Sequence, residues 1–154
     1  MRKYLILTML LFSLSLLTAG DYIIGTGTSN QNYVPFNGSY NYGWSRFFFT
    51  ADELLAAGMT GTVEISKIGF QLVSNTLDNY ITNDQRIYIR EFYDENYPSS
   101  PQYINPSSLT AAFQGTISWT SPGWVFIQLT NPYTYTYNGG SPEANGIEIL
   151  WENR

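Results

Sequence analysis

The chain has 154 residues, of which 17 % are aromatic and 12 % are charged, with no cysteine and no histidine. This length suits one domain with its own hydrophobic core, and so few charges among so many rings exclude a disordered chain. The missing residue types exclude disulfides, a thiolate nucleophile, a serine–histidine triad and most zinc sites. Any catalysis would have to use carboxylates, Tyr, Lys or an N-terminal amine.

The N-terminus has the layout of a secretory signal peptide. A positively charged start and an apolar stretch over residues 4–17 precede small residues at Thr18 and Gly20. The apolar stretch is shorter than the roughly 20 residues of a membrane-spanning helix. The sequence therefore predicts a secreted or cell-surface protein with no stable membrane span, with a signal peptide over 1–20 and one folded domain over 21–154.

The folded domain is acidic. The chain has 7 basic and 12 acidic residues, and two of the basic ones lie in the signal peptide, so five bases against 12 acids give a net charge of −7. Such a domain repels phosphate backbones, so nucleic acid is not an expected partner.

Short β-rich runs separated by turn residues fill the domain. This pattern is typical of an all-β antiparallel sandwich, jelly-roll-like, with about seven or eight strands and one short helical turn. In chain order, the runs that carry the strand pattern cover 21–29, 45–50, 65–73, 85–93, 116–129 and 147–152.

Two short motifs predict particular local structures, a helix and a turn. Thr50 and Glu53 have the spacing of a helix capping box, and Gly58 follows as a terminator, so a helix of about two turns is expected between them. The motif "TSPG" divides the run 116–129 and predicts a tight turn between two hairpin strands.

The last run, 147–152, alternates strongly, with Glu148 and Glu152 opposite its apolar positions. The sequence stops two residues after Glu152, with no capping turn and no trailing strand. We therefore expect a further strand or domain downstream of Arg154.

Five segments are distinctive when taken together: "IGTGTSNQNYVPFNGSYNYGWS", "TADELLAAGMTGTVEISKIGF", "ITNDQRIYI", "GTISWTSPGWVFIQLTNPYTY" and "IEILWENR". They resemble a β-sandwich module found in secreted, multidomain bacterial proteins. Such proteins often carry fibronectin type III modules and a C-terminal sorting domain, and usually run on past the "WENR" region. The resemblance covers nearly all of the domain in order. It implies a β-sandwich with no assigned catalytic residues, so it supplies no site.

The stretch "NGSYNYGWSRFFFT" predicts an outer loop that leads into a Phe-rich inner strand. Its rings Tyr40, Tyr42 and Trp44 are candidates for stacking on sugars. The favoured interpretation is that these rings lie over the edge of the sandwich with their polar atoms in water.

A second aromatic set is Tyr133, Tyr135 and Tyr137, whose spacing places three rings on one face of a strand. Such a stripe would fit a short run of sugar units, but cross-strand packing of the rings on a β surface is the favoured interpretation. Trp124 and Phe126 point away from the apolar face of their own strand, which indicates an exposed patch or a contact with a neighbouring module.

Acidic residues suggest two further kinds of site. Carboxylates in two loops offer oxygen ligands for Ca²⁺, although solvated turns are the favoured interpretation; they are Asp78, Asp84, Asp94 and Glu95. No other cofactor is expected. A glycosidase would need two facing carboxylates, and the acids in or beside predicted strands are Glu64, Glu91, Glu148 and Glu152. An inward Glu could instead pair with Arg46 or Arg90.

The sequence thus predicts a non-catalytic accessory or adhesion module of structural type, whose partners are neighbouring modules or cell-surface components. A carbohydrate-binding module that uses surface Tyr and Trp rings is the alternative, with polysaccharide as the partner. A carboxylate-based glycoside hydrolase is a third possibility.

Overall fold

The computed structural model describes residues 20–25, 35, 40, 42–72, 80–93, 102–119, 122–139 and 145–154. Residues 1–19, nearly all of the predicted signal peptide, lie outside this part. The elements in chain order are β1 (Gly43–Phe49), α1 (Ala51–Ala56), β2 (Thr62–Leu72), β3 (Tyr80–Phe92), the 3₁₀ turn η1 (Pro106–Ser108), β4 (Phe113–Trp119), β5 (Gly123–Thr136) and β6 (Gly146–Asn153).

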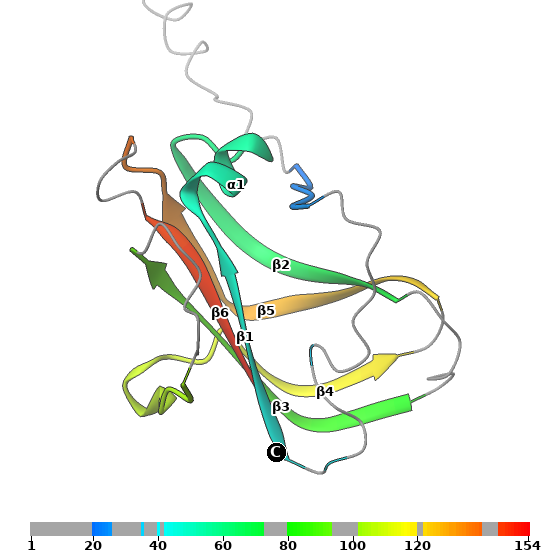
Figure 1. The fold of residues 1–154 in the computed structure, drawn as a ribbon. Coiled ribbons are helices and arrows are strands. Elements are labelled where there is room, and N and C mark those ends of the chain that lie inside the picture. Colours follow the sequence, from blue (N-terminus) through cyan, green and yellow to red (C-terminus); the bar gives the residue numbers. More distant parts are fainter. Residues whose placement is uncertain are drawn as a thin grey trace, which may run out of the picture.

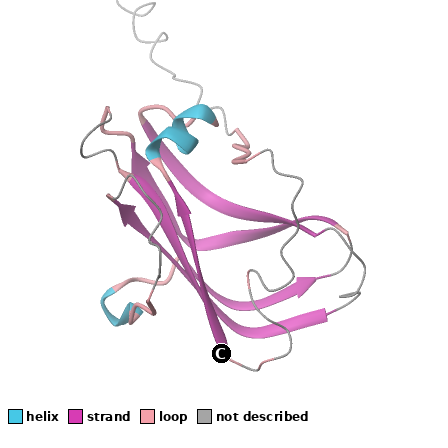
Figure 2. Ribbon diagram, viewed as in Figure 1, coloured by secondary structure: helices cyan, strands magenta, loops and turns pink. Residues whose placement is uncertain are grey.

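The strands form two antiparallel sheets that pack face to face (Figure 1). One sheet, here called sheet A, has four strands in the order β1-β6-β3-β4, and the other, sheet B, pairs β2 with β5. Strands make up most of the described chain, with α1 beyond one end of the sheets (Figure 2). The prediction of an all-β antiparallel sandwich is confirmed. Six strands are described, and residues 21–25, at the start of the first predicted strand, are not in a strand.

The predicted helix is present as α1. The Thr50 hydroxyl accepts a hydrogen bond from the backbone N–H of Glu53, and the Glu53 carboxylate accepts one from the backbone N–H of Thr50. Gly58 follows with φ +95, a conformation that glycine adopts without strain. No helix in the described part of the chain is long and apolar enough to cross a membrane.

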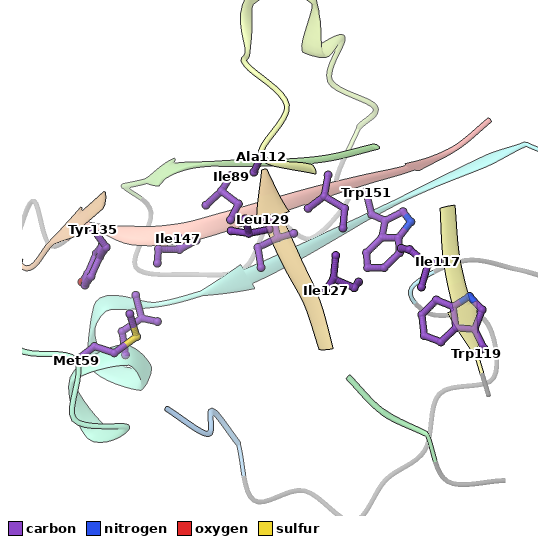
Figure 3. Close-up of a cluster of buried hydrophobic side chains, with 13 residues drawn as sticks. Met59, Ile89, Ala112, Ile117, Trp119, Ile127, Leu129, Tyr135, Ile147 and Trp151 are labelled. Atoms are coloured by element: carbon purple, nitrogen blue, oxygen red, sulfur yellow. The ribbon is translucent and has the colours of Figure 1, made fainter. Parts of the chain in front are cut away.

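The core lies between the two sheets and is built from alternate residues of both (Figure 3). Trp119 and Trp151 are fully buried there, with ring centroids 6.2 Å apart. Their indole N–H groups donate hydrogen bonds to Thr82 Oγ1 at 3.0 Å and to Gln85 Oε1 at 2.8 Å. Both buried rings therefore have a polar partner, which is the usual condition for burying Trp.

The prediction that residues 116–129 form a β-hairpin is wrong. β4 pairs with β3 in sheet A, whereas β5 pairs with β2 in sheet B, so the connection between β4 and β5 crosses from one sheet to the other. Ile117 of β4 and Ile127 of β5 are both buried in the core that the sheets enclose. A Pro–Gly turn signal marks where the chain reverses, and it does not decide whether the two strands pair in one sheet or lie in facing sheets.

β6 is a central strand with both faces buried. Ile147, Ile149 and Trp151 enter the core, and Glu148 and Glu152 point to the outer face of sheet A, as the alternation predicts. Yet Glu148 is only 1 % exposed and Glu152 only 4 %. Each of these carboxylates has polar partners from β1, β3 or the β3–β4 connection. Together they form a polar layer on the outer face of sheet A, and the candidate site lies at one end of this layer.

Candidate functional site

A hollow of about 340 Å³ lies where β1 begins and β6 ends, beside the C-terminus marked in Figure 1. Trp44 of β1 is the cross-strand partner of Glu152 of β6, which brings these two side chains together. The β3–β4 connection contributes Tyr103 to the same place. The residues that line the hollow are Tyr42, Gly43, Trp44, Tyr103, Glu152, Asn153 and Arg154.

Three aromatic rings border the hollow and remain open to solvent. Tyr42 is 76 % exposed, Trp44 42 % and Tyr103 46 %. The rings of Trp44 and Tyr103 are in contact, with centroids 5.7 Å apart and planes inclined at 58°. The hollow thus has an aromatic wall made by two segments that are far apart in the sequence.

The carboxylate of Glu152 organises the polar side of the hollow. Its Oε1 accepts a hydrogen bond from Tyr103 Oη at 2.7 Å, and its Oε2 accepts one from Tyr88 Oη at 3.4 Å. Arg154 Nη2 lies 3.2 Å from Oε2 in an ion pair. The hydrogen bond to Glu152, with a smaller contribution from burial, raises the pKa of Tyr103 because both disfavour its phenolate form.

This arrangement suits recognition of a small polar ligand with apolar faces. Ring faces can pack on the C–H surface of a sugar, while the exposed guanidinium of Arg154 offers N–H donors and tyrosine hydroxyls offer oxygen acceptors. A concave surface with a few converging polar groups is also the general form of a ligand site.

The predicted aromatic group around the first strand is thus partly assembled. Tyr42 and Trp44 lie together in the hollow. Tyr40 is exposed, and its carbonyl oxygen accepts a hydrogen bond from Asn153 Nδ2 at 3.4 Å, so its backbone adjoins the hollow without lining it. Sequence reasoning missed Tyr103, because no pattern in its Pro- and Ser-containing segment places it against Trp44.

A second exposed aromatic surface lies on the outer face of sheet B. Trp124 and Phe126 are 46 % and 54 % exposed, and their ring planes are only 13° apart, with centroids 5.9 Å apart. The Lys67 ammonium lies 4.7 Å from the Phe126 centroid and 2.8 Å from the Asp21 carboxylate. A Cβ at Gly69, opposite Phe126 in the register, would lie 2.8 Å from that ring. Glycine therefore leaves room for the rings to lean over β2. We call these two rings the Trp124–Phe126 patch.

Tyr133, Tyr135 and Tyr137 do not form an exposed stripe, and packing, the favoured interpretation of their spacing, accounts for them. Tyr135 is 1 % exposed and belongs to the core, and the other two rings are partly buried against it. The Tyr135 hydroxyl donates a hydrogen bond to the backbone oxygen of Asn145 at 2.8 Å. The three rings share a face, as the alternation predicts, but this face points toward sheet A, and the Tyr135 hydroxyl reaches a backbone oxygen there.

The four strand acids do not form a facing pair. Glu64 points to the outer face of sheet B, and Glu91 lies beside Asn145 and Tyr133. Only Glu148 and Glu152 share a face, and their positions four residues apart on one strand separate them by roughly 13 Å.

Glu148 forms the arginine pairing that was the alternative to catalysis. Its carboxylate pairs with Arg46 Nε and with Arg90, whose Nε lies 2.6 Å from Oε2. With both oxygens engaged by guanidinium groups in a buried setting, this carboxylate has a structural role in the outer layer of sheet A.

The predicted calcium ligands lie mostly outside the described residues, as Asp78, Asp94 and Glu95 do. Asp84 is described, and its carboxylate pairs with Arg86 at 3.3 Å. Within the described ranges, no group of three or more acidic side chains is placed to hold a metal ion.

Comparisons with protein-family models, with curated proteins and with solved structures give no match.

Proposed function

We propose that the chain is a non-catalytic module of a secreted or cell-surface protein and that it binds carbohydrate in the hollow. The observation that carries this proposal is the meeting of Tyr42, Trp44 and Tyr103 around a concave surface that also holds Arg154. Flat rings beside hydrogen-bonding groups match a sugar, which has both C–H faces and hydroxyl groups. The signal-peptide layout and the resemblance to modules of secreted proteins are consistent with an encounter with polysaccharide outside the cell.

The distribution of carboxylates supports a binding role without catalysis. A glycosidase places its two carboxylates about 5 Å or about 7–9 Å apart. Among the described residues that line the hollow, Glu152 is the one carboxylate, and it is already hydrogen-bonded to Tyr88 and Tyr103 and paired with Arg154. The backbone positions of Glu148 and Glu152 are roughly 13 Å apart along β6, and the Glu148 carboxylate is held by Arg46 and Arg90, so the two acids are not placed as a catalytic pair.

The test is depletion of the protein from solution by a panel of insoluble polysaccharides, with near-UV circular dichroism as the check on folding. We expect saturable binding to at least one polymer and at least a tenfold weaker affinity in Trp44→Ala. Trp124→Ala is the matched control, because Trp124 is similarly exposed but lies on the outer face of sheet B. Equal losses in both variants, or no binding by the folded protein, would contradict the proposal.

A second candidate is a structural or adhesive role for the Trp124–Phe126 patch. Two large rings that are about half exposed and nearly parallel are a surface that a neighbouring domain or a cell-surface component can cover. This candidate predicts that beads coated with the protein adhere to the cells that produce it. Trp124→Ser would reduce this adhesion and Trp44→Ala would leave it unchanged, whereas carbohydrate binding in the hollow predicts the reverse.

A further inference from the structure

We propose that the hollow selects an uncharged, hydroxyl-rich sugar over an anionic one. This inference rests on the proposed carbohydrate binding and adds the chemical class of the sugar. It follows from how the charges at the hollow are arranged, since Arg154 is the one cationic residue and Glu152 the one acidic residue among the described residues that line it.

Glu152 compensates the charge of Arg154 without using all of its donors. The two side chains form an ion pair at 3.2 Å, in which the carboxylate is about 5 % exposed and the arginine side chain 42 % exposed. A guanidinium has five N–H donors, and the contacts with Glu152 involve one nitrogen, Nη2. The remaining donors can serve hydroxyl oxygens, whereas a sugar carboxylate or sulfate would have to compete with Glu152 for the same cation.

The carboxylate itself offers little to a ligand. Tyr88, Tyr103 and Arg154 approach its two oxygens and occupy most of its lone pairs. Glu152 therefore acts as a positioning residue that holds the Tyr103 ring and the Arg154 guanidinium in place. A cationic sugar gains no free partner from it.

The other arginines on the outer face of sheet A do not make the hollow attractive to anions. Arg86 lies opposite Glu152 in the β3–β6 register, but Asp84 compensates its charge at 3.3 Å. Arg46 and Arg90 share Glu148, whose position lies roughly 13 Å along β6 from that of Glu152. That separation exceeds the screening length of about 8 Å at physiological salt. The folded domain as a whole carries −7 by sequence, which opposes the approach of polyanions.

The experiment compares polymers that differ only in charge. Affinity electrophoresis and calorimetry of the full chain would use dextran, starch and hydroxyethyl cellulose, each beside its carboxymethylated counterpart, at low and at physiological salt. We expect at least one neutral polymer to bind tenfold or more tightly than its charged counterpart, with an affinity that salt does not change.

Two variants sharpen the result. In Glu152→Gln the charge of Arg154 is no longer compensated, so the preference should move at least tenfold toward the carboxymethylated polymer and become sensitive to salt. Arg154→Leu, at an exposed position, should weaken binding of the neutral polymer about tenfold, and this variant is the test if Glu152→Gln proves unfolded by circular dichroism. Unchanged affinity in Arg154→Leu, or unchanged selectivity in a folded Glu152→Gln, would overturn the inference.

The failures of the two proposals are distinguishable. Tighter binding of a carboxymethylated polymer by the wild type, still lost in Trp44→Ala, would overturn charge selection and leave carbohydrate binding in place. Absence of binding to both members of every pair by the folded protein would overturn both proposals.

Discussion

Tyr103 and Glu152 are 49 residues apart in the chain, and the phenolic hydroxyl donates a hydrogen bond to Glu152 Oε1 at 2.7 Å. This bond ties the β3–β4 connection to β6 across the outer face of sheet A. Arg46 of β1 makes a second tie, because its Nη1 donates to the backbone oxygen of Gln102 at 2.9 Å. The aromatic wall of the hollow is therefore positioned by polar contacts to two strands of the sheet.

Tyr103→Phe is expected to lower the free energy of unfolding by about 1 kcal/mol, because Glu152 loses one donor while the ring stays in place. This value is below the range of about 1.5–3 kcal/mol for a hydrogen bond to a charged group because Tyr103 is about half exposed. Urea denaturation measures it. Tyr42→Phe is the control, since Tyr42 is 76 % exposed, and it should change stability by less than about 0.5 kcal/mol. Equal stability of Tyr103→Phe and the wild type would show that the bond does not hold the connection.

Glu148→Ala is expected to destabilise the fold by about 3 kcal/mol. The Glu148 side chain is 1 % exposed and that of Arg46 9 %, so removing the carboxylate leaves a buried guanidinium without its counter-charge. Glu64→Ala, on the solvent side of β2, is the control and should have an effect below about 0.5 kcal/mol. The comparison is made by chemical denaturation at neutral pH, and similar effects of the two substitutions would contradict the structural role of Glu148.

Gly69→Val is expected to displace the Phe126 ring with little change in stability. A Cβ there would meet ring atoms of Phe126 at 2.8 Å and of Trp124 at 3.3 Å, and these exposed rings can move. The ring-current shift that Phe126 imposes on Lys67 should therefore fall in an NMR spectrum. Gly43→Ala is the matched control because nothing lies within 4 Å of a Cβ at that position. Persistence of the Lys67 shift in Gly69→Val would mean that the rings do not lean over Gly69.

Local signals in the sequence predicted local structure well. The capping box at Thr50 and Glu53 and the terminating Gly58 define α1, because each depends on contacts within a few residues. Alternation likewise placed Ile147 and Glu148 on opposite faces of β6. These features need no knowledge of which strands are neighbours.

Features that depend on strand order could not be predicted in this way. The Pro–Gly motif between β4 and β5 marks a turn, but the assignment of these strands to different sheets follows from pairing with β3 and β2. The Tyr135 ring was assigned to one face, but which sheet covers that face is a tertiary property. Glu148 and Glu152 are buried because β6 is central and because the β3–β4 connection contacts the outer face, and neither fact is encoded in the strand's own pattern.

The hollow likewise combines residues that the local sequence indicates with residues that only strand pairing brings together. The exposed rings Tyr42 and Trp44 stood out as candidates from their own loop. Their partners Tyr103 and Glu152 come from other segments, and the β1–β6 register joins Trp44 to Glu152. Patterns within one segment can suggest the aromatic part of a site, whereas its polar part emerges only after the strands have paired.

Because the pKa of Tyr133 is raised in the fold, we expect the protein to lose stability at alkaline pH. Burial, followed by the negative charge of Glu91, raises the pKa of Tyr133 from its ordinary value of 10.0 to about 12. Above pH 10 the unfolded chain loses this proton while the folded chain keeps it, so stability is complete below pH 10 and falls as the pH rises through 12. Because the side chain is partly exposed, the contribution of this group is of order 1 kcal/mol.

The loss is measured as the change in the urea unfolding midpoint between pH 9 and pH 12. Phenolate absorbance is followed in parallel. Tyr133→Phe removes the titrating group and should make the decline in stability with pH shallower. Part of the decline should remain, because burial also raises the pKa of Tyr135. Identical profiles of stability against pH for the wild type and Tyr133→Phe would contradict the prediction. They would mean that the free-energy cost of ionising Tyr133 in the fold contributes nothing to alkaline unfolding.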